Sequence, residues 1–180
     1  MTDWQSCHQL GGKKDSMLRH PDLISLLQST IGASILQCQA LETGLVHCLL
    51  VGIKLDRKAD SRLIDKMFND YGELTFGQLA NQIDKLSDVP QELKSKLKVL
   101  KKERNWLAHR SWSDTLPHVN STPPDILLQY IQRIDSIGDN ALQLSKQFAD
   151  ILDDRVKKAG VSKEYLSKKA EEIYRRWLAG

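Results

Sequence analysis

Two long segments of this chain repeat apolar residues at the α-helical period, and they constrain the fold more than any other feature. The first runs from Asp22 to about Lys54, and the second from about Thr122 to about Lys158. Apolar residues three or four positions apart form one stripe on a helix, and that stripe must be buried against another element. The two stripes contain Leu23, Leu27, Ile31, Ile35, Cys38, Leu45 and Leu49, and Leu127, Ile131, Ile134, Ala141, Phe148 and Leu152.

Shorter helices are predicted between and after the two long ones. Thr75 is placed to cap one of them, and Pro90 suits the first turn of another. The stretch SDTLPHVNSTPP has the composition of a loop. No segment alternates long enough to predict a strand, so the sequence predicts an all-α bundle of two long and several shorter helices. The shorter helices are expected at about 58–69, 75–86, 90 to 109 or 112, and from 162 onward.

Size and composition fit a single globular domain. The 180 residues are 41% hydrophobic and 27% charged, with a net charge of +3. We expect residues 1–20 to form a polar arm and residues 21–180 one helical domain with its own core. The mildly basic balance permits an anionic partner without requiring one.

The N-terminal sequence and the cysteines both favour the cytoplasm. MTDWQSCHQLGGKK lacks the apolar core of a secretory signal, and the longest apolar run, Leu45–Ile53, is too short to span a membrane. Of the three cysteines, Cys38 and Cys48 fall on one predicted helix, about 15 Å apart. They are too far apart for a disulfide, and an unpaired set of cysteines is typical of a reducing compartment.

The helix after Pro90 carries an arginine on its apolar stripe. Its core positions are occupied by Leu93, Leu97, Leu100, Arg104 and Leu107. A buried arginine is costly unless it is paired or faces a wet cavity. The alternative is an arginine whose stem lies on the core while its head reaches water.

The first long helix has a matching acid. Its stripe passes from Cys38 to Glu42 and then to Leu45. Two lone opposite charges on two apolar faces of one bundle suggest that Glu42 and Arg104 meet. The alternative is that Glu42 lies at the edge of the stripe and is solvated.

Asn105 and His109 lie four residues apart and therefore share a helix face. Arg104 and His109 are five apart, which separates their directions by about 140° on an ideal helix. Three arrangements could still bring them together. The last helical turn could distort, the arginine side chain could swing round, or a second copy of the chain could complete the site.

The stretch RNWLAH, Arg104 to His109, resembles the signature of the HEPN superfamily. In that signature an arginine is followed by a polar residue, often Asn, and a histidine closes the motif. Its position at the end of a late-middle helix, before a polar loop and a long helix, also resembles this superfamily. So does the segment ALETGLVHCLL, Ala40–Leu50, on the first long helix.

The resemblance implies a helical HEPN-like bundle and a specific activity. Many HEPN proteins are metal-independent endoribonucleases, and many are toxins or phage-defence effectors. They commonly act as homodimers whose two motifs line one cleft, and some are paired with a nucleotidyltransferase-like antitoxin. Others have lost activity and serve as modules that bind nucleotide, RNA or a partner protein.

The residue types fit RNA cleavage on chemical grounds as well. RNA carries its own nucleophile, the 2′-OH, so cleavage needs an acid or base near neutral pKa and a fixed positive charge at the phosphate. We therefore predict His109 as acid or base, Arg104 as the group that stabilises the phosphorane, and Asn105 as an orienting residue. Glu42 is predicted to support Arg104. No metal or other cofactor is expected, since the histidines lack metal-ligand spacings.

Basic residues near the motif are candidates for contact with RNA. Lys101, Lys102 and Arg110 are closest to it in the sequence, although a solvated helix face is the alternative for such residues. Arg104 and His109 lie on diverging faces of one chain, so a second copy related by a two-fold axis could complete the site. We therefore expect a C2 homodimer with the residue 90–112 helices near its axis, acting on RNA without a membrane.

Overall fold

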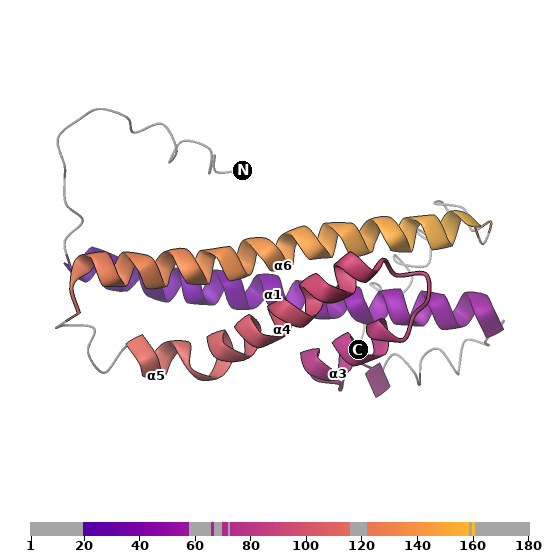
Figure 1. Ribbon diagram of the computed structural model, residues 1–180, viewed down its shortest axis with the longest axis horizontal. Coiled ribbons are helices and arrows are strands. Elements are labelled where there is room, and N and C mark those ends of the chain that lie inside the picture. Colours follow the sequence, from indigo (N-terminus) through magenta and orange to yellow (C-terminus); the bar gives the residue numbers. More distant parts are fainter. Residues whose placement is uncertain are drawn as a thin grey trace, which may run out of the picture.

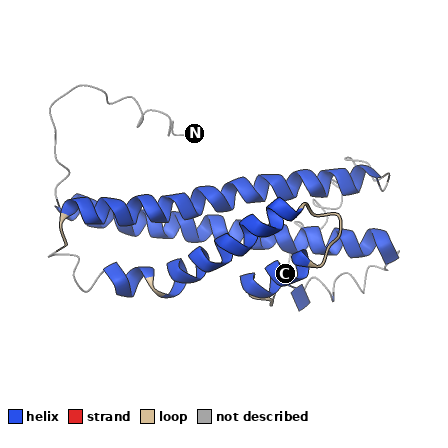
Figure 2. Ribbon diagram, in the orientation of Figure 1, coloured by secondary structure: helices blue, strands red, loops and turns tan. Residues whose placement is uncertain are grey.

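The computed structural model describes residues 20–57, 66, 70–71, 73–115, 122–158 and 160, and only these are considered below. All regular secondary structure in these residues is helical (Figure 2), which confirms the predicted all-α class. The predicted polar arm lies outside the described residues, except that His20 already begins the first helix. The helix predicted at 58–69 lies outside them apart from Lys66, and the one predicted from 162 lies wholly outside.

Two long helices form the frame of the molecule. Helix α1 covers His20–Arg57 and helix α6 covers Pro124–Lys158. They lie side by side and run in the same direction (Figure 1). Both long apolar stripes are largely buried where the helices meet, as predicted, although Ile35 and Leu152 are only partly buried. Gly160 follows α6 with a positive φ of 68°, which suits glycine at a helix end.

Helices α1 and α6 approach each other closely at Gly138. An added Cβ at Gly138 would lie 2.8 Å from Oγ of Ser34, which is 1% exposed. The Ser34 hydroxyl donates a hydrogen bond of 2.8 Å to the carbonyl of Ile134. A serine hydroxyl and a glycine therefore bring the two backbones together at this level.

Shorter helices complete the core against the two long ones. Helix α3 covers Phe76–Asp84 and begins at the predicted cap, Thr75, whose hydroxyl accepts a bond from the Gln78 backbone in a capping box. Helix α4 covers Gln91–His109, with Pro90 as its N-cap residue, and crosses α1 in the opposite direction (Figure 1). Its buried residues are the four predicted leucines, Leu93, Leu97, Leu100 and Leu107.

The predicted loop after α4 begins later than expected. Helix α5 covers Ser111–Thr115, so the first three residues of SDTLPHVNSTPP are helical. The turn is closed by Arg110, whose backbone N–H bonds to the Trp106 carbonyl at 2.8 Å and whose carbonyl accepts from Asp114 at 2.8 Å. The backbone of Arg110 thus links the last turn of α4 to α5, and the start of the predicted loop is a short helix instead.

Helix α1 is unusually apolar for a bundle helix with one open side. Its segment Pro21–Val51 is long and apolar enough to cross a membrane by length and composition alone. Within the 18-residue window that meets this criterion, 44% is buried inside the bundle. The core helix of a soluble protein satisfies the same criterion, so this feature by itself assigns no location.

Candidate functional site at the junction of α1 and α4

Arg104 and Glu42 meet at the crossing of α4 and α1. Nε and Nη2 of Arg104 both donate to Oε1 of Glu42, at 3.1 and 2.8 Å. The two side chains are 26% and 22% exposed, so the pair lies at the edge of the core. The predicted contact between the two lone charges is confirmed, and the solvated alternative for Glu42 is not what the structure shows.

The arginine keeps hydrogen-bonding capacity after this pairing. A guanidinium carries five N–H donors, and two of them are used on Glu42. Among the described residues, no further hydrogen bond is made by Arg104, which leaves three donors. A fixed, planar cation with open donors is the arrangement that binds an anion with two oxygens.

A small hollow lies beside the pair. Its walls come from Ile35, Cys38, Gln39, Arg104, Leu107 and Ala108. Its volume of about 30 Å³ holds a water molecule or two and is far too small for a nucleotide. Burial raises the pKa of the Cys38 thiol to about 11, with Arg104 opposing the shift and Glu42 adding to it. Cys38 is therefore a neutral thiol in the wall and not a nucleophile.

His109 and Asn105 lie on the outer side of α4. Both residues are exposed, and His109 is the last residue of the helix. Among the described residues, no hydrogen bond or ion pair joins Arg104, Asn105 and His109. Helix α4 is α-helical through His109, and the Arg110 backbone N–H still bonds to the Trp106 carbonyl, so the last turn is not distorted and the two side chains leave α4 in different directions.

A polar cluster that the sequence did not indicate fixes the end of α4. The indole N–H of Trp106 donates to Oδ2 of Asp114 at 3.0 Å. The guanidinium of Arg133 stacks 3.6 Å from the centre of the Trp106 ring and pairs with Glu103 at 3.0 Å. These contacts tie α4 to α5 and α6, so the corner that carries His109 is held on two sides. The next residues on α5 include Trp112, which is 51% exposed.

The candidate RNA-contacting residues differ in how free they are. The Lys101 ammonium approaches Oδ1 of Asn81 on α3 at 3.5 Å, and its side chain packs over Gly77. Lys102 and Arg110 are exposed. In the described part of the chain neither of them makes an ion pair, so these two are better placed than Lys101 to meet a phosphate.

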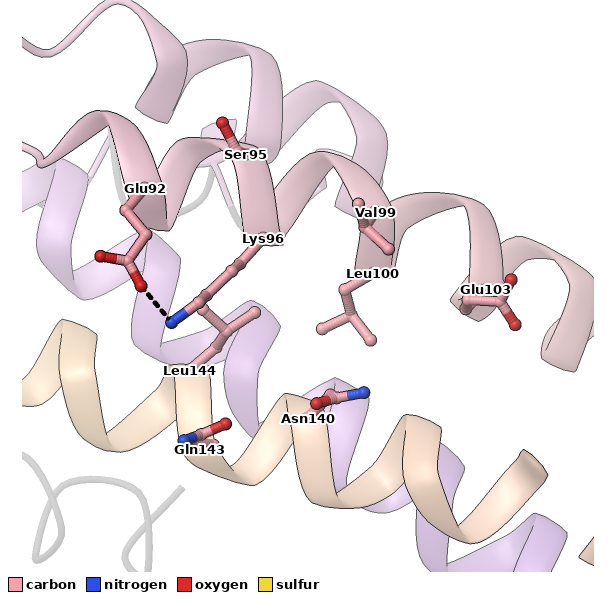
Figure 3. A pocket seen from close by; sticks show the side chains of 9 residues that line it. All are labelled: Glu92, Ser95, Lys96, Val99, Leu100, Glu103, Asn140, Gln143 and Leu144. Atoms are coloured by element: carbon pink, nitrogen blue, oxygen red, sulfur yellow. Dashed lines mark ion pairs between the residues drawn. The ribbon is translucent and has the colours of Figure 1, made fainter. Parts of the chain in front are cut away.

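A larger groove lies between α4 and α6, away from the predicted residues. Figure 3 shows Leu100 and Leu144 on its floor and the ion pair of Glu92 with Lys96, at 2.6 Å, along one side. The groove has a volume of about 340 Å³. Its other acid, Glu103, is paired with Arg133. Each charged residue that lines the groove is thus already paired, and none of the predicted site residues lines it.

A buried arginine on α6 was not predicted from the sequence. Arg155 on α6 is paired through Nε and Nη2 with both oxygens of Asp88, each at 2.7 Å. Its Nη1 donates to the Cys48 carbonyl and lies 3.2 Å from the Cys48 sulfur. Its side chain is 8% exposed. The heptad spacing from Phe148 would have placed Arg155 on the core face, but the charges around it, Asp153, Asp154, Lys157 and Lys158, obscured that signal.

Comparison of the chain with protein-family models, curated proteins and solved structures finds no match. Within the described ranges, no three His, Cys, Asp or Glu side chains gather in a way that could hold a metal ion. Any statement of function therefore depends on the geometry at the junction of α1 and α4 and on the sequence resemblance.

Proposed function

We propose that this protein is a metal-independent endoribonuclease of the HEPN type, acting as a toxin or phage-defence effector. The observation that carries the proposal is the arginine at the junction. Arg104 is fixed by Glu42, keeps three donors that no described residue uses, and lies five residues from an exposed histidine at the end of the same helix. A fixed cation and a nearby acid or base are the two groups that cleavage at a 2′-OH requires.

In the proposed reaction, His109 removes the proton of the 2′-OH or protonates the leaving 5′-oxygen. The 2′-oxygen attacks the adjacent phosphorus, the bond to the 5′-oxygen breaks, and a 2′,3′-cyclic phosphate results. Arg104 stabilises the charge on the phosphorane, and Asn105 orients His109 or the phosphate. Lys102 and Arg110 hold the flanking backbone.

A single chain does not bring these groups together, and this supports a second copy at the site. The hollow beside Arg104 is too small for anything larger than water, and Arg104 and His109 point in different directions. A two-fold partner could place its own histidine opposite the arginine of the first chain. The predicted C2 homodimer is therefore part of the proposal.

The different directions of Arg104 and His109 also favour a second candidate function. A non-catalytic HEPN-like dimer would need Arg104 to bind an anionic group of a nucleotide or RNA, without any requirement for His109 to face it. The exposed position of His109, which forms no hydrogen bond with Arg104 among the described residues, is the specific observation for this alternative.

Cleavage of a mixed RNA substrate with EDTA present separates the two candidates. We expect the wild-type protein to cleave and His109→Ala to lose about 10²–10⁴-fold in rate, the usual range for an acid–base group. The matched control is Asp150→Ala, which removes an exposed ionisable side chain from α6. Circular dichroism should show that all three proteins are folded. RNA binding without cleavage by wild type would favour the binding module, and equal cleavage by His109→Ala would remove His109 from the mechanism.

A further inference from the structure

The outer face of α1 carries no charge over most of its length. Between Asp22 and Lys54 the only Asp, Glu, Lys or Arg is Glu42, and Glu42 is turned toward Arg104. The exposed surface of α6, in contrast, is lined with ten charged residues, Asp125, Arg133, Asp135, Asp139, Lys146, Asp150, Asp153, Asp154, Lys157 and Lys158. A charge-free exposed face on a helix of this length is unusual for a solvated surface.

The most exposed large apolar side chain of the described chain is at the middle of this face. Leu36 is 66% exposed, and it lies midway between Ser25 and His47, the two ends of the exposed stripe. These 22 residues of rise correspond to about 33 Å of helix. A leucine at the centre of an uncharged stripe is a natural point of contact with another apolar surface.

Residue size along the stripe is nearly symmetric about Leu36. Four residues away on either side are Gly32 and Ala40, and seven residues away are Ser29 and Thr43, all exposed. When two copies of α1 cross antiparallel about a two-fold axis at Leu36, each position meets its symmetric counterpart. Leu36 then meets its own copy on the axis, and Gly32 of each chain meets Ala40 of the other, so that these small residues allow the helices to approach closely.

The hydroxyl groups of Ser29 and Thr43, on either side of Leu36, do not oppose burial. The Ser29 hydroxyl donates to the Leu26 carbonyl at 2.9 Å, and the Thr43 hydroxyl donates to the Gln39 carbonyl at 3.2 Å. Each donor is thus satisfied within its own helix, so desolvation of these residues leaves no unpaired donor. The central part of the face, from Ser29 to Thr43, can therefore be buried without leaving these two hydroxyl donors unpaired.

The face continues into the candidate site. Gln39 borders both the exposed stripe and the hollow beside Arg104, and Ala108 on α4 forms the opposite wall of that hollow. Since α4 runs opposite to α1, its C-terminal end lies beside Ile35, next to Leu36. A two-fold axis at Leu36 brings the ends of two α4 helices, each with its His109, to opposite sides of one interface.

We propose that a second copy of this chain docks on the outer face of α1, antiparallel and with Leu36 on the two-fold axis. The inference rests on the proposed function in that the dimer completes that site, while the surface is argued from α1 itself. A charge-free face offers no ionic pairing to a charged partner, and it lacks the Lys and Arg residues typical of helices that lie on membranes. A two-fold contact along the middle of α4 would instead oppose Lys98 and Lys102 of the two copies.

Light scattering of the full chain tests the surface directly. We expect wild type at micromolar concentration to have twice the 20.5 kDa mass of one chain, and Leu36→Lys to have the mass of one chain with unchanged circular dichroism. The matched control is Leu142→Lys on α6, where the leucine is 42% exposed, and it should remain dimeric. A monomeric wild type overturns the proposal, as does a dimeric Leu36→Lys. Monomeric wild type that floats with phosphatidylcholine vesicles would assign the face to lipid instead.

A cysteine on the axis gives an independent readout. In a Cys7→Ala background, Leu36→Cys should form a covalent dimer under mild oxidation, because a residue on a two-fold axis meets its own copy within disulfide range. Leu142→Cys in the same background should stay monomeric on a non-reducing gel. Absence of the Leu36→Cys cross-link overturns the antiparallel arrangement. A dimer that fails to cleave RNA would leave this interface standing and count against the ribonuclease proposal alone.

Discussion

Arg104 and Arg155 are both arginines in helical apolar stripes, and they differ in what is left of their bonding capacity. Arg155 is 8% exposed and uses all three nitrogens, on Asp88 and on Cys48. Arg104 is 26% exposed and uses two nitrogens on one oxygen of Glu42. A saturated, buried cation ties helices together, whereas a half-buried cation with open donors is held ready for another anion. Partner count and exposure, more than the presence of a charge in a core stripe, distinguish the two roles.

Replacing Arg155 by alanine should mainly lower stability, whereas replacing Arg104 should mainly lower RNA cleavage. Arg155→Ala removes a tie between α6, α1 and the α3–α4 connection, and we expect a loss of about 3 kcal/mol in unfolding free energy. Arg104→Ala should lose about 10²–10³-fold in RNA cleavage through the missing phosphate contact, with a much smaller loss of stability. Urea titration and single-turnover cleavage measure the two quantities. Equal destabilisation by both variants would show that Arg104 is as structural as Arg155.

The Arg104–Glu42 pair could be predicted from the sequence because each residue is the single charge on its apolar stripe. One arginine interrupts a leucine stripe on α4, and one glutamate interrupts an apolar stripe on α1. Arg155 obeys the same periodicity, but it lies among other charges near the end of α6, and its partner Asp88 lies in a connection whose path no periodicity predicts. The helical class and most stripes followed from the 3.6-residue period.

What the sequence could not predict depended on three-dimensional detail. The corner at Arg110, with the Trp106–Asp114 bond and the Arg133 stack, joins residues from three helices. A polar, proline-containing stretch predicts a loop from composition, and only the tertiary contacts explain why Ser113 and Asp114 are helical. The direction of His109 relative to Arg104 likewise depends on where α4 ends.

Removing Glu42 should cost less than removal of one partner from a fully buried pair. A fully buried partner is worth about 3–5 kcal/mol, but both side chains here retain contact with water, so we expect about 1–2 kcal/mol for Glu42→Ala. Glu42→Gln keeps an acceptor for Arg104 and should recover part of this. Thermal unfolding measured by circular dichroism gives the comparison. A loss of 4 kcal/mol or more would mean, by the same reasoning, that the pair is shielded from water and that Arg104 is as structural as Arg155.

The Arg155 pair should also make stability depend on pH. Hydrogen bonds from Arg155 hold the pKa of Asp88 below its usual range, opposed by partial burial. Because the folded-state pKa is lowered, the stabilisation is fully present above the unfolded-state value, near 3.9, and is lost as pH falls through the folded-state value. Asp88→Asn should lower stability at neutral pH and flatten its decline below about pH 5. An unchanged acid profile in Asp88→Asn would assign the acid sensitivity to other carboxylates.

The smallest expected change in stability concerns two glycines, Gly138 on α6 and Gly44 on α1. At Gly138 an added methyl lies 2.0 Å from Oε1 of Gln37 and 2.8 Å from Oγ of Ser34. The Gln37 amide can swing away, but Ser34 is buried and bonded to Ile134, so α1 and α6 must separate slightly. At Gly44 the nearest atom, Oγ of Ser145, is at an ordinary 3.8 Å.

Alanine is favoured over glycine within a helix by about 1 kcal/mol, so Gly44→Ala should stabilise the protein by up to that amount. Gly138→Ala gains the same propensity but loses the close contact, and we expect a net loss of about 1 kcal/mol. Differential scanning calorimetry of the two variants measures the contrast. Separation of α1 from α6 should weaken the bond from Arg155 to the Cys48 carbonyl and leave the α1–α4 contact of Arg104 unchanged. RNA cleavage by Gly138→Ala should therefore stay near the wild-type rate, and a loss as large as that of Arg104→Ala would show that the two arginines are coupled through the frame.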